Sequence, residues 1–212
     1  MNPAATGIFR VGFLNHGGFS VEAAKGKNKE QKLYNHLIKY KFSSMGLAEN
    51  NVHWNSVPAD ERLEDRTRGW FEQLARNTTY FKDCPVKTPH QWGGCDLWSI
   101  NKAAYRIASR GSDPSGLGRW TWTRYRGKNG KHVRVVAAYH PVENKSGPDS
   151  VWNQHKSFFL AKMDTRNPRE IFNCDLTREA ATWIEAGDQV IIGVDANEPL
   201  RGGSSSLERA LA

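Results

Sequence analysis

The stretch VIIGVDANEP, residues 190–199, runs from apolar residues into two polar side chains placed two positions apart. The apolar run 190–194 is typical of a fully buried, central strand. Because Asp and Asn disfavour strand interiors, the strand is predicted to end at Asp195. Asp195 and Asn197 then have two interpretations. They form an Asx turn and nothing more, or they belong to a site at the strand end.

The length and charge of the chain favour one domain with a polyanionic partner. Its 212 residues contain no linker-like stretch in the interior, so we expect a single domain over 1–212, with 201–212 as a flexible, truncated end. Thirty Lys and Arg against 22 Asp and Glu give a formal charge of +8. This excess favours nucleic acid, with DNA as the expected form.

The cysteines and the N-terminal residues predict an intracellular protein. Three cysteines form no disulfide framework, which favours a reducing compartment. Cys84, His90 and Cys95 fit no common zinc template. No signal peptide and no apolar run of about 18 residues is evident, so neither secretion nor a membrane partner is expected.

Several other predicted strands also end on polar residues. The strand 7–15 ends at Asn15, and SSMGLAEN runs into Glu49. A hairpin around GKNGK, residues 127–131, has a second strand that ends at Tyr139. Functional side chains gather where loops leave the ends of sheet strands, so we expect these groups to lie together.

Helical patterns separate the strands. Helices are predicted over 20–42, over 59–77, from Asp149 or Ser150 onward, and over 173–188 with Asp175 as the N-cap. The mixed order of helices and strands predicts an α/β (α+β) fold of sheets flanked by helices.

The polar groups at the strand ends suit a divalent cation and a phosphate. Carboxylate and amide oxygens are ligands for Mg²⁺ or Mn²⁺ rather than zinc. Glu49 is the candidate metal ligand, and Asp195 would orient or deprotonate a water. Asn15 and Asn197 would hold the carboxylate and the phosphate, while Tyr139 would donate a hydrogen bond to the phosphate. This set predicts hydrolysis of a phosphoester.

Five motifs together resemble the endonuclease/exonuclease/phosphatase superfamily, which has the deoxyribonuclease-I-like fold. The first strand ends in Asn15, and a later strand ends in the glutamate Glu49. Another strand ends in Tyr-x-Pro at Tyr139, and VIIGVDAN is similar to a Gly-Asp-x-Asn strand with Val194 inserted. The fifth motif is QWGGCDLWSI, residues 91–100. The resemblance implies two packed, mostly antiparallel sheets in a four-layer α/β/β/α sandwich, and it is closest to endonuclease-type members of mobile or viral genes. It also implies the same roles for Asn15, Glu49, Tyr139, Asp195 and Asn197, with Mg²⁺ as the cofactor.

The chain departs from this family in two places. Gly17 stands where the family often has Asp or Asn. Only fifteen residues follow Asn197, and they contain no counterpart of the family's final Asp and His; His155 is the last histidine. A split gene, a domain taken from a longer chain and a degenerate binding member all explain this. His140 or His155 is a candidate replacement for the histidine. An incomplete sheet would leave an open edge, so we expect a homo-oligomer or a partner chain that completes it.

Basic and aromatic residues near the strand ends form a candidate surface for the nucleic-acid backbone. Its members are Arg66, Arg68, Arg119, Arg124, Arg126, Lys128 and Trp122. The sequence thus predicts a Mg²⁺-dependent phosphodiesterase on nucleic acid, an endonuclease that nicks. Two alternatives stay open: a catalytically impaired nucleic-acid-binding or assembly module, and a phosphatase acting on a soluble or lipid phosphoester.

Overall fold

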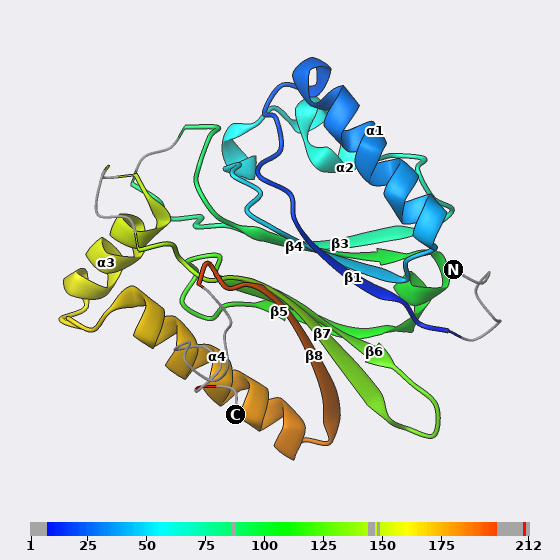
Figure 1. The fold of residues 1–212 in the computed structure, drawn as a ribbon. Coiled ribbons are helices and arrows are strands. Elements are labelled where there is room, and N and C mark those ends of the chain that lie inside the picture. Colours follow the sequence, from blue (N-terminus) through cyan, green and yellow to red (C-terminus); the bar gives the residue numbers. More distant parts are fainter. Residues whose placement is uncertain (1–7, 86–87, 144–146, 148, 199–209, 211–212) are drawn as a thin grey trace.

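Two four-stranded β-sheets stack face to face, and helices cover their outer faces (Figure 1). The computed structural model describes residues 8–85, 88–143, 147, 149–198 and 210, so most of the end predicted to be flexible lies outside it. The layering confirms the predicted α+β sandwich. The helices are α1 (Ala23–Tyr40) and the short α2 (Leu63–Arg66) over the first sheet, and α3 (Val151–Ala161) and α4 (Pro168–Glu185) on the side of the second. In the described ranges, no helix has the length and apolar character needed to cross a membrane.

The first sheet has the order β1-β2-β4-β3. β1 and β2 are parallel, and the other neighbours are antiparallel. Every residue of the two central strands, β2 and β4, is buried, as expected for strands covered on both faces. The strands are β1 (Val11–Asn15), β2 (Ser44–Ala48), β3 (Leu74–Thr79) and β4 (Cys95–Ile100).

The second sheet has the order β5-β6-β7-β8 and contains the predicted hairpin. Asn129 and Gly130 link β6 to β7 with φ values of 55° and 73°. A type I′ turn requires a positive φ at both of its central residues, which explains the Asn-Gly pair. The strands are β5 (Ile107–Ser112), β6 (Trp120–Arg126), β7 (His132–Tyr139) and β8 (Asp188–Asp195), with β8 parallel to β7.

Phe13 of β1 is the side chain that packs β1 closely against β8. Its ring lies against Gly46 of β2 and Gly193 of β8. A Cβ atom at Gly193 would be 2.4 Å from Cδ2 of Phe13, so any larger residue there would push the two sheets apart. The two sheets are also joined by Tyr125, whose hydroxyl is 3.0 Å from Oγ of Ser44 and 2.6 Å from Oγ of Ser99. This packing brings the ends of β1 and β8 together.

The prediction that 190–194 form a fully buried, central strand is wrong. β8 is the edge of its sheet, and most of its residues are half-buried or exposed. Val190, Ile192 and Val194 pack toward α4, whereas Ile191 on the other face is 43% exposed. An unbroken apolar run is explained by one face under a helix and one face partly under the opposite sheet. Periodicity does not distinguish this from a central strand.

The predicted helix over 59–77 is also wrong. Only α2 and a 3₁₀ turn form, Gly69 adopts a φ of 80°, and the chain then enters β3. The aromatic residues that suggested a helical face, Trp70 and Phe71, still pack against the core under α1. Pairing of β3 with β4 overrides the local helical preference.

Candidate active site

Asn15 joins carboxylates from both sheets through its single side-chain amide. Its Nδ2 donates to Oε2 of Glu49 at 2.8 Å and to Oδ2 of Asp195 at 2.7 Å. The Oδ1 atom of Asn15 accepts from the backbone N–H of Gly17 at 2.8 Å, which fixes the orientation of the amide. Asn15 and Asp195 are the last residues of β1 and β8, and Glu49 directly follows β2. The structure thus brings these three residues together at the ends of their strands.

Glu49 reaches this position through an unusual backbone conformation. Its φ is 63°, in the left-handed region that costs a non-glycine residue about 1–2 kcal/mol. Two backbone hydrogen bonds hold it: Glu49 N–H donates to Gly94 O at 2.9 Å, and Gly18 N–H donates to Glu49 O at 2.7 Å. Such strain persists only where the surrounding structure fixes it, and it is commonly found at functional sites.

Tyr139 and Asn197 lie beside the carboxylates. Nδ2 of Asn197 donates to the backbone oxygen of His140 at 2.8 Å and approaches Oδ2 of Asp195 at 3.4 Å. Burial raises the pKa of Tyr139, and the nearby charges of Glu49 and Asp195 raise it further. The phenol therefore stays protonated at neutral pH and is able to donate a hydrogen bond.

Lys29 is a site residue that the sequence analysis missed. From α1, its Nζ donates to the backbone oxygens of Gly17 at 3.0 Å and Gly18 at 2.6 Å. Burial lowers the pKa of Lys29, while the charge of Glu49 acts in the opposite direction. The sequence shows Lys29 as one of several lysines on a polar helix face, so no local signal distinguishes it.

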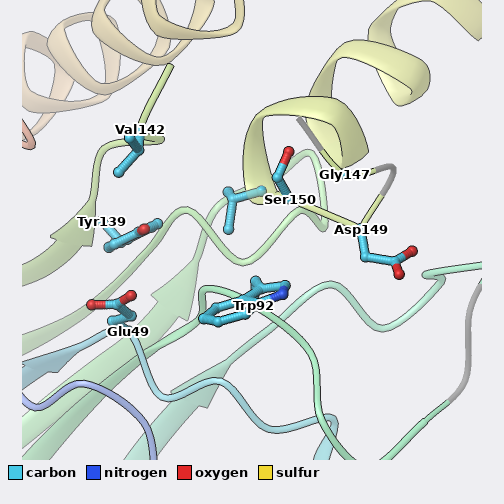
Figure 2. A pocket seen from close by; sticks show the side chains of 8 residues that line it. Glu49, Trp92, Tyr139, Val142, Gly147, Asp149 and Ser150 are labelled. Carbon is cyan, nitrogen blue, oxygen red and sulfur yellow. The ribbon is translucent and has the colours of Figure 1, made fainter. Parts of the chain in front are cut away.

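A cavity of about 400 Å³ opens beside Glu49 and Tyr139 (Figure 2). Trp92 forms one wall, and its side chain is a second feature missed by the sequence analysis. The only available signal was its position before the Gly93-Gly94 pair that precedes β4. The remaining lining residues are Val142, Gly147, Asp149, Ser150 and Val151.

The two histidines considered as replacements for the family histidine are both buried. Nδ1 of His140 is 2.7 Å from the backbone oxygen of Ala196, and burial lowers the pKa of this histidine. His155 of α3 lies near the ion pair between Arg119 and Asp113; burial lowers its pKa to about 3. Neither is among the described residues that line the cavity.

The basic residues predicted to follow a nucleic-acid backbone are not gathered into one surface. Arg66 is buried in an ion pair with Glu30, and Arg119 is buried with Asp113 at 2.7 Å. Arg124 pairs with Asp188 at 2.8 Å. These three cations neutralise buried or partly buried carboxylates, so they are not available to bind phosphate.

The other members of that set are more exposed but scattered. Trp122 is half-buried and stacks with Arg134, whose guanidinium carbon is 4.0 Å from the ring centroid. Arg68 is exposed and pairs with Asp65. Arg126 and Lys128 are exposed near the hairpin turn, at the opposite end of β7 from Tyr139. The length of that strand separates them from the site by roughly 20 Å.

The side chains at the strand ends fit a hard divalent cation. Two carboxylates are held close by one amide, and among the described residues neither Oε1 of Glu49 nor Oδ1 of Asp195 accepts a hydrogen bond. Mg²⁺ typically takes one or two carboxylates and completes its shell with water and substrate oxygens. Among the described residues, no group of three or more His, Cys, Asp or Glu is placed to hold a metal.

Comparison with solved structures places this arrangement in a known fold. The chain superposes on an endonuclease/exonuclease/phosphatase family protein from Bacteroides thetaiotaomicron with a TM-score of 0.54 and 11% identity, over 96% of this chain and 66% of that one. The chain has the endonuclease/exonuclease/phosphatase fold. No family model and no curated protein sequence matches it.

Two further proteins of this fold have named activities. One is a mannosyl-6-phosphatase from Bacteroides thetaiotaomicron, with a TM-score of 0.55, 11% identity and coverage of 96% of this chain and 70% of that one. The other is the 3′ phosphatase NExo from Neisseria bound to a product DNA hairpin, with a TM-score of 0.50, 14% identity and coverage of 90% and 58%. Proteins with the endonuclease/exonuclease/phosphatase fold thus include both sugar phosphatases and DNA-processing enzymes.

Proposed function

We propose that this chain is a divalent-metal-dependent phosphodiesterase that hydrolyses nucleic acid as a nicking endonuclease. The observation that supports it best is the Asn15 amide, which holds Glu49 and Asp195 together beside the cavity that contains Tyr139. Structural likeness to nucleases and phosphatases supports the same class of chemistry.

Each side chain has a role in this reaction. Glu49 would hold Mg²⁺ or Mn²⁺, and the bound cation would stabilise negative charge on the phosphate. Asp195 orients the attacking water and accepts its proton, and Asn15 keeps the Asp195 carboxylate in position. Asn197 orients the phosphate, and Tyr139, protonated at neutral pH, donates a hydrogen bond to it or to the leaving oxygen.

Nicking of supercoiled plasmid tests this proposal. With Mg²⁺ the chain is expected to convert supercoiled plasmid to open circles, and EDTA should abolish the reaction. Asp195→Ala should lower the rate by roughly 10²–10⁴-fold because the water loses its base. Asp60→Ala removes an exposed carboxylate from another element and serves as the matched control. Nicking that survives in Asp195→Ala at the wild-type rate would contradict the assignment.

A second candidate is a nucleic-acid-binding module with impaired catalysis. It is favoured by the cavity lining, which includes no histidine among the described residues, and by the burial of His140 and His155. This candidate predicts no nicking but DNA binding that weakens steeply with salt. A phosphatase would instead release phosphate from a phosphomonoester and leave the plasmid intact.

We also propose that an added strand, from a second copy or a partner chain, covers one side of the sandwich. β1 and β8 are the edges of their sheets and contact each other across the sandwich. Three large apolar side chains on or next to these strands are 41–52% exposed: Ile8, Leu14 and Ile191. Unpaired edges with apolar side chains favour strand addition.

A further inference from the structure

We propose that Trp92 is a stacking platform for one nucleobase of the substrate, next to the phosphate at Glu49 and Asp195. This inference rests on the proposed function and adds a substrate class to it: single-stranded or locally unpaired nucleic acid. A base inside a stacked duplex cannot reach an aromatic wall in a pocket unless it leaves the stack.

Trp92 is exposed where an indole would normally be covered. The residue is 48% exposed, and its side chain lines the cavity that also contains Glu49 and Tyr139. Figure 2 shows Trp92 lying between Glu49 and Asp149. The described structure gives this ring one aromatic neighbour, the edge-on ring of His90 at a centroid distance of 4.7 Å and an interplanar angle of 86°. Edge-on packing supports the indole without covering both of its faces.

The backbone around Trp92 is fixed, so the ring is positioned before a ligand arrives. Gln91 is buried, and its Nε2 donates to the backbone oxygen of Phe81 at 2.8 Å. On the other side, the N–H of Gly93 donates to Oδ1 of Asn51 at 2.8 Å. A preorganised aromatic side chain loses little conformational entropy on binding, which favours its use as a contact surface.

The charge and size of the cavity fit a base rather than a second phosphate. Its two charged lining residues, Glu49 and Asp149, are both acidic, and the described lining contains no Lys or Arg. A further phosphate would be repelled there, whereas the N–H groups of a base, including N3–H of thymine, are donors to a carboxylate. A volume of about 400 Å³ is within the range of sites for small organic ligands.

The test compares two oligonucleotides that share the same sugar-phosphate backbone. One is single-stranded oligo-dT, and the other is an oligomer of equal length built only from tetrahydrofuran abasic units. For oligo-dT, Trp92→Ala is expected to raise KM roughly 5- to 100-fold, the range of one base–aromatic stack. Trp92→Phe should retain most of the wild-type affinity. For the abasic oligomer, kcat/KM should be unchanged by either substitution.

Tyr105→Ala removes another exposed aromatic ring and is the control, since Tyr105 is 63% exposed outside the cavity. If Trp92→Ala lowers kcat/KM equally on the two oligomers, the stacking role is overturned and Trp92 is only a wall of the cavity. If the wild-type chain hydrolyses neither oligomer, plasmid nicking still tests the proposed function by itself, and binding of the oligomers measured in EDTA decides the subsite. Tighter binding of oligo-dT than of the abasic oligomer, lost in Trp92→Ala, supports it; equal binding of the two overturns it.

Discussion

Asn15 is the residue on which the site geometry depends most directly. It is exposed, yet its amide holds the Glu49 and Asp195 carboxylates against their mutual repulsion. We expect Asn15→Ala to lower hydrolysis by roughly 10- to 100-fold, as for other residues that orient catalytic carboxylates. The free energy of unfolding should change by less than about 1 kcal/mol, because an exposed side chain is removed.

Asn35→Ala, on the exposed face of α1, is the control for this change. Plasmid nicking and urea unfolding of the same samples measure the two effects. An Asn15→Ala protein that loses activity and several kcal/mol of stability together would show that Asn15 is mainly structural.

At the scale of elements, the outer edges of β1 and β8, with which no other described strand pairs, predict self-association or partner binding. Ile191→Lys places a charge on the exposed face of β8, where it should block addition of a strand. We expect sedimentation velocity to show that the wild-type chain associates at micromolar concentration and that Ile191→Lys is monomeric. Stability should be nearly unchanged, because Ile191 is already 43% exposed. A wild-type chain that stays monomeric throughout would rule out self-association and leave only a different partner.

The elements also show which sequence signals were sufficient to predict turns and helix ends. The Asn129-Gly130 turn and the N-cap Ser150 were predictable because each depends on local backbone chemistry. The start of α4 was missed although Asn167-Pro168 is a local signal, an N-cap followed by proline at the first helical position. Asp175, predicted as the cap, instead lies within α4 and pairs with Arg119 at 2.9 Å.

The errors in the predicted basic surface have a different cause from the missed start of α4. The positions of Asn15, Glu49 and Asp195 follow from where strands end, which the sequence shows. The pairing of Arg66 with Glu30 and of Arg119 with Asp113 depends on tertiary contacts, so the sequence does not distinguish these cations from exposed ones. β3 is a further example, because its pairing with β4 is not encoded in its own residues.

For the whole molecule, burial of His155 predicts a loss of stability in mild acid. Its pKa is lowered from 6.5 to about 3 in the folded chain. Below pH 6.5 the unfolded chain binds a proton that the folded chain does not, so stability is complete above that pH and falls as the pH falls toward 3. Between pH 7 and pH 5 the loss from this group is about 2 kcal/mol.

Urea unfolding at pH 7 and pH 5 measures this loss. His155→Gln removes the titrating group, so the variant should be less sensitive to the change of pH even if it is less stable at both values. His36, exposed on α1, provides the control substitution His36→Gln, which should leave the pH dependence unchanged. An identical pH dependence in His155→Gln and the wild-type chain would contradict the prediction.

The bridge made by Asn15 also has a consequence for timing during protein synthesis. Asn15 and Asp195 are separated by 180 positions, so the ribosome makes one end of this contact long before the other. At translation rates of roughly 5–20 residues per second, the interval is on the order of 10–40 s. Throughout that interval the nascent chain carries Glu49 and Asn15 but lacks the group proposed to activate water. On the proposed mechanism, hydrolytic activity would begin only after β8 has emerged, so for this interval the growing chain lies near messenger and ribosomal RNA without a complete site.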